Sequence, residues 1–302
     1  MVNQAQGFAE AMGLKPELRT FRARAPWRYL APQFWLMPHW AAGPGSGDIG
    51  PPWPDIIVAC GSKSIAPVLR IRRKSAGRTR VIYVQDPTID PARFDLVVAP
   101  MHDRLSGPNV LVVRGAVNRV TPQRLAADAA KFAARFDHLP RPRVTVTIGG
   151  DSGAYRLTEA VIDKLCEDLA TLCRRDGAGL MITTSRRTGA ANEAKLRAKL
   201  AGLPAYFWDG TGDNPYYAFL GLADFIVTTG DSVNMVSEAL VSGKPVHVAH
   251  LEGGTAKFRR FHDDLEREGL TRPFKGVLET WVYRPLDDTQ RAAAEARRRL
   301  GF

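Results

Sequence analysis

The chain has 302 residues, of which 45% are hydrophobic and 24% charged, a composition that excludes a disordered or fibrous protein. No stretch of 18 consecutive apolar residues occurs, so the sequence predicts no membrane-spanning helix. The net charge of +11 is uneven: residues 1–140 hold 19 Lys and Arg against 10 Asp and Glu, and residues 141–302 hold 23 against 21. This asymmetry indicates an anionic partner for the N-terminal half, with a solvated basic surface as the alternative.

The three cysteines, Cys60, Cys166 and Cys173, are too few and odd in number for a disulfide framework. They are expected to be reduced thiols, which favours a cytoplasmic location. The sequence contains no CxxC or HExxH spacing and no DxD triplet. No metal site is therefore expected.

The first predicted element is an amphipathic helix over residues 3–13, with Ala5, Phe8, Ala9 and Met12 at helical spacing. A parallel α/β domain usually opens with a strand before its first helix. No strand precedes this helix, so the first strand of an N-terminal domain is expected to be missing, through truncation or a misplaced start.

A basic aromatic segment follows, from Arg19 to Trp53. It has no acidic residue between Glu17 and Asp48, and its arginines alternate with aromatic residues: Arg19, Arg22, Arg24 and Arg28 with Phe21, Trp27, Tyr29, Phe34, Trp35 and Trp40. Arginines beside rings at headgroup depth suit docking on an anionic inner-membrane surface. The alternative is that the aromatic residues fill the core of the N-terminal domain or the interdomain cleft. No signature supports stacking on RNA, so no nucleic-acid partner is expected.

Short apolar runs then predict the strands of two parallel sheets. The first series lies at residues 55–59, 81–84, 96–99 and 110–113. The proline-rich residues 139–143 indicate a linker. A second series predicts a five-stranded Rossmann-like domain, with strands at 144–148, 180–184, 205–208, 225–229 and 246–249 and helices at 157–175, 192–200, 215–222 and 233–241. A last helix is predicted over residues 287–300.

A glycine-rich loop directly follows the predicted strand 144–148 and precedes a helix: Gly149, Gly150, Asp151, Ser152 and Gly153. Glycines let a backbone approach a phosphate, and a helix N-terminus supplies free N–H donors. The spacing matches neither GxxxxGK[ST] nor GxGxxG. The alternative is a tight turn that needs glycine for steric reasons alone.

Two more polar loops follow predicted strands. Ser185, Arg186 and Arg187 offer bidentate donors for a diphosphate. In the other loop, Asp231 or Ser232 caps a helix that carries Ser237 and Glu238. The alternatives are solvated arginines, a plain helix cap and a solvated glutamate. Because open α/β sheets bind ligands at the carboxyl ends of their strands, the three loops together favour a binding site.

The second half of the chain resembles the C-terminal domain of GT-B glycosyltransferases, which bind nucleotide-sugars with a glycine-rich loop and a glutamate near an SEAxxxGKP-like segment. It is more specifically similar to bacterial relatives of the plant elongated-mitochondria fission factor, a group also described as nucleoside-diphosphate-sugar epimerases. The matching segments are SRRT at 185–188, GDNPY at 212–216, GDSVNMVSEA at 230–239 and KFRRFH at 257–262.

The resemblance implies a GT-B-like α/β fold, with two Rossmann-like domains facing across a cleft. The expected domains are residues 1–138 on the acceptor and membrane side, residues 139–285 for the nucleotide-sugar, and a terminal helix over 286–302 that packs back on the first domain. The implied activity is glycosyl transfer from a nucleoside-diphosphate-sugar to a lipid or envelope acceptor, with no tightly bound cofactor. The alternative within the family is a non-catalytic membrane-associated scaffold.

The resemblance places the nucleotide-sugar on the three loops of the second half. The donor-site residues expected there are Gly149, Gly150, Asp151, Ser152, Gly153, Ser185, Arg186, Arg187, Asp231, Ser232, Ser237 and Glu238. The family pattern also includes a first strand and a glycine-rich acceptor-side loop, which are expected to be missing here.

Candidate catalytic residues occur in the first half, where His102 and Asp103 follow the predicted strand 96–99. A histidine beside an aspartate can act as a general base near neutral pH. The alternative is that both are loop and capping residues. An epimerase of the short-chain type is disfavoured, because none of the seven tyrosines begins a YxxxK pair.

Overall fold

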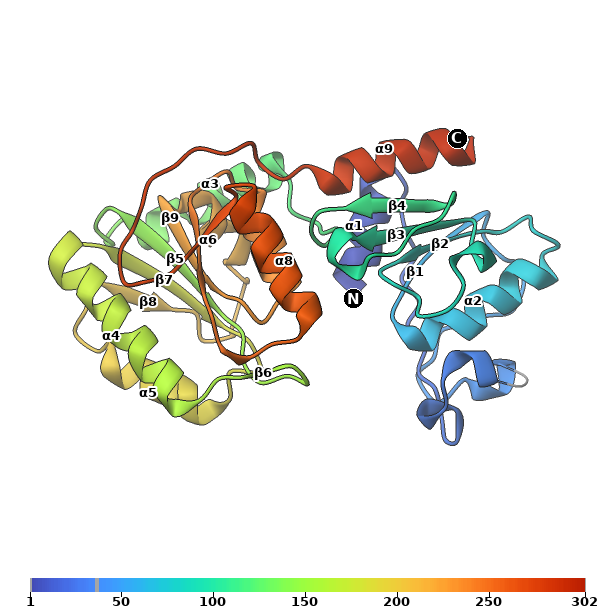
Figure 1. Ribbon diagram of the computed structural model, residues 1–302, viewed down its shortest axis with the longest axis horizontal. Coiled ribbons are helices and arrows are strands. Elements are labelled where there is room, and N and C mark those ends of the chain that lie inside the picture. The colour runs from blue at the N-terminus through green and yellow to red at the C-terminus, as the bar shows by residue number, and fades with distance from the viewer. Residues whose placement is uncertain (1, 36–37, 302) are drawn as a thin grey trace. The chain divides into compact units, whose positions relative to one another are not determined.

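The computed structural model describes residues 2–35 and 38–301, and the chain divides into two compact units (Figure 1). Unit 1 comprises Met1–Arg119 and Asp287–Phe302, and unit 2 comprises Val120–Leu286. Each unit is built on its own parallel sheet and has its own buried apolar clusters. The chain therefore contains two α/β domains.

The boundary between the units lies at residues 119/120 and not at the proline-rich residues 139–143. The reason is helix α3 (Pro122–Phe136), which packs against α6 (Tyr216–Leu222) of unit 2. Gly221 permits this close approach, since a Cβ atom there would lie 2.6 Å from the carbonyl oxygen of Leu125. The ring of Phe136 also contacts that of Phe219 edge-on. Residues 139–143 instead lead directly into the first strand of unit 2.

Unit 1 contains a four-stranded parallel sheet in the order β1-β2-β3-β4. Its side chains alternate between two faces, as strand geometry requires. One face packs against α1 and α9, and the other packs against α2. The elements are β1 (Ile56–Cys60), β2 (Arg80–Val84), β3 (Leu96–Pro100), β4 (Val110–Val113), α1 (Val2–Ala11), α2 (Ser62–Lys74) and α9 (Asp288–Leu300).

The terminal helix α9 belongs to unit 1, although the chain reaches it only after completing unit 2. Its first turn is anchored to the loop after β4. The buried carboxylate of Asp288 accepts the backbone N–H of Gly115 at 3.1 Å, and the hydroxyl of Thr289 accepts that of Asn118 at 3.0 Å. Buried alanines on α9 pack against α1, and the two helices are labelled beside the unit 1 sheet in Figure 1.

The basic aromatic segment forms a small folded layer against α2. An antiparallel bridge joins Ala23 to Ala42, and three short 3-10 turns lie between them: η1 (Trp27–Tyr29), η2 (Pro32–Phe34) and η3 (Pro38–Ala41). Trp35 is buried with Ala41 and with Ala66 of α2, and Phe21 and Trp27 pack around them. These three aromatic residues therefore occupy a small core.

Unit 2 contains a six-stranded parallel sheet in the order β12-β10-β9-β5-β7-β8. Helices α4 and α5 pack on one face, and α3, α6, α7 and α8 pack on the other. The strands are β5 (Arg143–Ile148), β7 (Gly179–Thr184), β8 (Ala205–Phe207), β9 (Phe225–Thr229), β10 (Val246–Ala249) and β12 (Thr271–Pro273). The remaining helices are α4 (Glu159–Asp176), α5 (Ala190–Lys199), α7 (Val233–Leu240) and α8 (Ala256–Arg267).

The prediction of five strands in this domain is wrong by one. The sixth strand, β12, has three residues and ends in proline, which is too short for an alternating pattern to show in the sequence. A two-stranded antiparallel ribbon, formed by β6 (Tyr155–Arg156) and β11 (Glu252–Gly253), is also absent from the sequence prediction. The ribbon connects the loop after β5 to the segment that leads into α8.

Candidate functional site

Three loops meet at the carboxyl edge of the unit 2 sheet. They follow β5, β7 and β9, and β5 pairs with both of the other strands. The loops are residues 149–153, 185–188 and 230–232, so the structure brings together the three polar segments that the sequence predicts to form one site.

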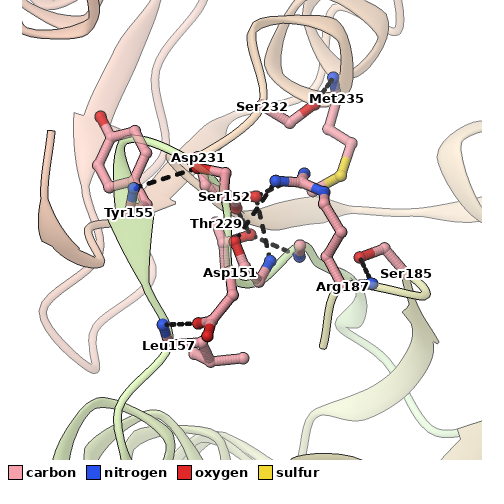
Figure 2. A network of polar contacts seen from close by, with 12 residues as sticks. Asp151, Ser152, Tyr155, Leu157, Ser185, Arg187, Thr229, Asp231, Ser232 and Met235 are labelled. Carbon is pink, nitrogen blue, oxygen red and sulfur yellow. Dashed lines mark hydrogen bonds and ion pairs between the residues drawn. The ribbon is translucent and has the colours of Figure 1, made fainter. Parts of the chain in front are cut away.

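Asp231 is the centre of this edge, and its side chain is fully buried. Its carboxylate accepts the Thr229 hydroxyl at 2.6 Å and the backbone N–H of Gly150 at 3.0 Å. The guanidinium of Arg187 completes the set at 2.6 Å, reaching toward Asp231 from the neighbouring loop (Figure 2). A buried carboxylate needs such partners, and here they come from all three strand ends.

The loop after β7 is fastened to the glycine-rich loop by its last two residues. Arg187 Nη1 donates to the Gly150 carbonyl at 3.4 Å. The Thr188 hydroxyl donates to the carbonyl of Gly149 at 2.5 Å and lies 3.1 Å from that of Ile148. Arg187 and Thr188 therefore hold the two loops together, while the side chain of Arg187 remains 39% exposed.

The backbone donors of the glycine-rich loop are already used within the protein. Gly149 N–H donates to the Thr229 hydroxyl at 2.7 Å, and Gly150 N–H donates to Asp231. Asp151 N–H and Ser152 N–H donate to the carbonyls of Arg187 and Tyr155, at 3.1 and 3.0 Å. A phosphate cradle needs free N–H groups, so the geometry gives no support to that role for these four amides.

Close packing explains the first two glycines of the loop. A Cβ atom on Gly149 would lie 2.1 Å from the carboxylate oxygens of Asp231, and one on Gly150 would lie 2.1 Å from the Arg187 carbonyl oxygen. The alternative of steric necessity therefore accounts for both residues. Gly153 has nothing within 4 Å of the equivalent position.

The polar side chains of the same loop shape the turn into β6. Asp151 Oδ1 accepts the Leu157 N–H at 2.8 Å. The Ser152 hydroxyl accepts the N–H group of Ala154 at 3.2 Å. It also accepts that of Tyr155 at 3.1 Å (Figure 2). Both residues lie in the predicted loop, but their side chains form the turn, whereas the sequence predicts them as donor-site residues.

Helix α7 begins beside this network. The Ser232 hydroxyl caps it by accepting the Met235 N–H at 3.3 Å. The first amides of a helix have no acceptor within the helix, so the start of α7 presents N–H groups and the positive end of its dipole at this edge. The Ser237 hydroxyl is buried and donates to the Val233 carbonyl at 2.7 Å. Ser237 is thus directed into its own helix and not toward the loops.

Glu238 is half-buried and pairs with Tyr216, a residue for which the sequence predicts no site role. The Tyr216 hydroxyl donates to Glu238 Oε2 at 2.6 Å. Burial raises the pKa of Glu238, against the opposing effect of this hydrogen bond. Burial, followed by the charge of Glu238, raises the pKa of Tyr216 well above its ordinary value. The phenol therefore stays protonated and orients the carboxylate.

Two arginines at this edge have no carboxylate or carbonyl partner among the described residues. Arg186 is exposed in the loop after β7, directly before Arg187. Arg259 is exposed in the first turn of α8 and is close enough to Tyr155 to lower the pKa of its hydroxyl. Burial, with a further contribution from Asp231, raises that same pKa overall. Arg259 and Tyr155 therefore flank the Asp231 network from the side of α8.

The sequence identifies the 257–262 segment by its family resemblance, but it does not predict α8 and therefore gives no site role to Arg259. The signal that could have found it is Gly253-Gly254-Thr255 ahead of an amphipathic run, since glycines and a threonine commonly precede a helix. Thr255 is the N-cap residue of α8 in the structure, without a side-chain cap hydrogen bond.

His262 of α8 contacts the loop that contains Asp231 through the backbone of Gly230. Its Nε2 lies 2.7 Å from the carbonyl oxygen of Gly230, and the ring is 4% exposed. An acceptor at that position requires the proton on Nε2. Burial, as the largest effect, lowers the pKa of His262. Gly230 leaves room for the ring, because a Cβ atom there would lie 3.1 Å from Nε2.

Replacing His262 with phenylalanine tests this contact. The variant keeps the ring volume but leaves the buried Gly230 carbonyl without its donor, so the free energy of unfolding should fall by about 1–3 kcal/mol in urea titrations. His262→Gln, whose amide can donate to the same oxygen, should recover most of that loss. Equal stability of His262→Phe and the unsubstituted protein would show that the bond contributes nothing.

The predicted catalytic pair lies in unit 1 and is buried. His102 Nε2 is 3.7 Å from Asp103 Oδ1, and each side chain is 2% exposed. A general base must come within hydrogen-bond reach of a substrate proton. The structure therefore places the two residues against each other, and their burial gives no support to the catalytic role.

The described residues contain no group of three or more His, Cys, Asp and Glu side chains that could hold a metal ion. Within the same part of the chain, no helix has both the length and the apolar character needed to cross a membrane.

Comparison with known families identifies the relatives of this chain. The family model described as "Mitochondrial fission ELM1" matches residues 1–300. The chain belongs to this family. Its membership confirms the resemblance found in the 185–188, 212–216, 230–239 and 257–262 segments.

Two curated proteins show how this ELM1-family chain relates to others. The mitochondrial fission protein ELM1 of Arabidopsis thaliana is 30% identical over 274 residues, which cover 82% of this chain and 64% of the plant protein. An uncharacterized protein of Rickettsia prowazekii is 22% identical over 280 residues, covering 80% of this chain and 78% of that protein. The chain thus spans less than two thirds of the plant relative's length.

A solved structure shares the fold of this family member. The UDP-GlcNAc 2-epimerase of Methanocaldococcus jannaschii, crystallised with UDP-GlcNAc and UDP, superposes with a TM-score of 0.51 at 14% identity. The match covers 81% of this chain and 75% of the epimerase. It confirms the predicted fold class, an α/β protein of two Rossmann-like domains of the GT-B type.

Proposed function

We propose that this chain is a GT-B-like glycosyltransferase whose unit 2 binds a nucleoside-diphosphate-sugar at the carboxyl edge of the six-stranded sheet. The nucleotide-sugar is the substrate, and no resident cofactor is invoked. Support comes from the shared fold, since the epimerase from Methanocaldococcus jannaschii carries UDP-GlcNAc and UDP in its crystals. Ligands in open α/β sheets bind at this edge in general.

The pair of unpartnered arginines is the observation that carries the proposal. Arg186 belongs to the same loop as Arg187, and Arg259 lies in the first turn of α8 and acts on Tyr155. The charge of Asp231 is already neutralised by Arg187. A diphosphate supplies negative charge and acceptor oxygens that such arginines bind through charge-assisted hydrogen bonds. The start of α7 adds N–H donors and a favourable dipole.

The proposed roles differ in part from those expected from the sequence. Gly149, Gly150, Arg187 and Asp231 hold the three loops in place, so that the edge is organised before a ligand arrives. Arg186, Arg259 and the start of α7 bind the diphosphate. Glu238, oriented by Tyr216, accepts a hydroxyl of the ribose or the sugar.

Calorimetric titration with UDP-, GDP-, CMP- and dTDP-sugars tests the proposal. Replacing Arg186 or Arg259 with alanine should each weaken binding by about tenfold or more, the value of one charge-assisted hydrogen bond. Arg174→Ala is the matched control, because Arg174 is exposed and lies in the last turn of α4, at the opposite edge of the sheet. A folded protein that binds none of these nucleotide-sugars contradicts the proposal.

One observation favours the second candidate, a non-catalytic scaffold. The backbone amides of the glycine-rich loop donate hydrogen bonds to other groups of the protein, as expected of a loop with a purely structural role. A scaffold would give no heat in the same titration, and Arg186→Ala and Arg259→Ala would then be indistinguishable from Arg174→Ala.

We further propose that the protein works in the cytoplasm, peripherally on the inner surface of an anionic membrane, with a lipid or envelope acceptor. The charge of unit 1 supports this location. It holds 20 Lys and Arg against 11 Asp and Glu, whereas unit 2 holds 22 against 20. Anionic leaflets attract basic surfaces of this kind. No nucleic-acid partner is proposed.

A further inference from the structure

Exposed apolar side chains gather in one short part of unit 1. Among the described residues, the large hydrophobic side chains that are at least 40% exposed comprise four scattered valines (Val2, Val112, Val277 and Val282) and a group between residues 18 and 40: Leu18 56%, Tyr29 71%, Leu30 40%, Phe34 67% and Trp40 55%. Single exposed apolar residues are ordinary, but a group of this kind marks a binding surface.

The segment that carries them is folded, and its own core is already filled. Trp35 is buried and donates its indole N–H to the Leu30 carbonyl at 3.1 Å, and its ring lies 6.0 Å from that of Phe21. Ala41 and Ala66 close this core. Trp35, Phe21 and Trp27 therefore fill a core, as the alternative to membrane docking predicts. The side chains of Tyr29, Phe34 and Trp40 lie outside this core and are exposed.

Four cations accompany the exposed rings without a carboxylate partner among the described residues: Arg22, Arg24, Arg28 and Lys63. The Arg28 guanidinium lies over the Tyr29 ring, 4.5 Å from its centroid, and Lys63 Nζ donates to the Arg28 carbonyl at 2.6 Å. Arg19 differs, because it forms an ion pair with Glu17 at 2.8 Å.

We infer that this basic aromatic surface, made of Leu18, Arg22, Arg24, Arg28, Tyr29, Leu30, Phe34, Trp40 and Lys63, docks unit 1 on an anionic lipid bilayer. The inference rests on the proposed membrane location and specifies the residues that produce it. The aromatic rings enter the headgroup layer, and the arginines and Lys63 bind lipid phosphates.

The aliphatic side chains of the basic aromatic surface favour a bilayer over single-stranded nucleic acid as its ligand. Base stacking requires a flat ring or guanidinium, which Leu18 and Leu30 do not offer. A bilayer interface accepts leucine and aromatic side chains alike. The lack of acidic residues between Glu17 and Asp48 also leaves no repulsion between the segment and the headgroups.

Vesicle co-sedimentation with the full chain, without nucleotide, tests the inference. Phosphatidylcholine vesicles with and without phosphatidylglycerol provide the lipid comparison. Binding should require phosphatidylglycerol and weaken as salt rises. The triple variant Arg22→Glu, Arg24→Glu and Arg28→Glu should bind at least about 100-fold more weakly, since each basic residue contributes severalfold.

The matched control reverses the same number of charges elsewhere in unit 1. Its substitutions are Arg73→Glu, Lys74→Glu and Arg78→Glu. These residues are exposed and lie at, or just beyond, the C-terminal end of α2. This control should keep most of the binding. A separate variant with Tyr29→Ser, Phe34→Ser and Trp40→Ser keeps every charge and should lose at least about tenfold, because the rings no longer enter the interface.

The possible failures are distinguishable. No binding of the unsubstituted chain to anionic vesicles overturns both the membrane location and this surface. Binding that the control triple abolishes and the Arg22, Arg24 and Arg28 triple retains overturns the surface alone. Binding to single-stranded RNA with none to anionic vesicles assigns the surface to nucleic acid and also overturns the inference.

Discussion

Replacing Asp231 with alanine is expected to lower the free energy of unfolding by about 3 kcal/mol, the lower end of the range for breaking a buried ion pair. The lower end applies because Arg187 is 39% exposed and can regain water. The variant also leaves the Gly150 N–H and the Thr229 hydroxyl without their acceptor. Urea unfolding measured by circular dichroism gives the value.

Asp213→Ala is the control for this prediction, because its ion pair with Lys131 is exposed and should contribute less than about 1 kcal/mol. Formate provides a second check. The space left by the Asp231 carboxylate keeps three donors, so formate should restore part of the lost stability of Asp231→Ala and none in the control. An Asp231→Ala variant as stable as the unsubstituted protein would show that the three loops do not depend on this carboxylate.

Unit 2 is expected to lose about 3 kcal/mol of stability as the pH falls from 6.5 to about 4, because of His247. This residue of β10 is fully buried, and its Nε2 accepts the Glu279 N–H at 3.1 Å. Burial is the largest effect and lowers the pKa of His247 to about 4. The charge of Glu279 raises this pKa, and the charge of Arg272 lowers it. The unfolded chain takes up the proton first, so the stabilising contribution is complete above pH 6.5 and is lost toward pH 4.

Unfolding by urea at several pH values, followed by tryptophan fluorescence, measures this dependence, since Trp281 lies 5.0 Å from the His247 ring. His247→Gln retains an acceptor for Glu279 but does not titrate. Its stability should change by about 3 kcal/mol less than that of the unsubstituted protein over the same interval. Parallel pH profiles for the two proteins would contradict the assignment to His247.

Much of the fold follows from local sequence patterns, and the exceptions have physical causes. β4, β9 and β10 lie at their predicted residues, because buried parallel strands are short β-branched runs between turns. The domain boundary was misplaced because the contact between α3 and α6 through Gly221 joins residues far apart in sequence. β12 depends on its pairing with β10 and shows no pattern of its own.

The position of the candidate site could be predicted, but the roles of its residues could not. Strand ends are visible in sequence, so the three loops were found together. Whether Gly150 N–H is free for a phosphate depends on Asp231, which lies 81 residues away and reaches it only in the folded chain. The same holds for Ser237, whose hydroxyl is bound within its helix, and for Arg259, which depends on α8.

A crystal structure of the chain grown with UDP-GlcNAc at a concentration well above its dissociation constant tests the central claim most directly. We expect a diphosphate between Arg186 and Arg259 at the start of α7, with the Asp231–Arg187 pair unbroken. A nucleotide bound at another place in unit 2, or one that displaces Asp231 from the amide of Gly150, would contradict that claim.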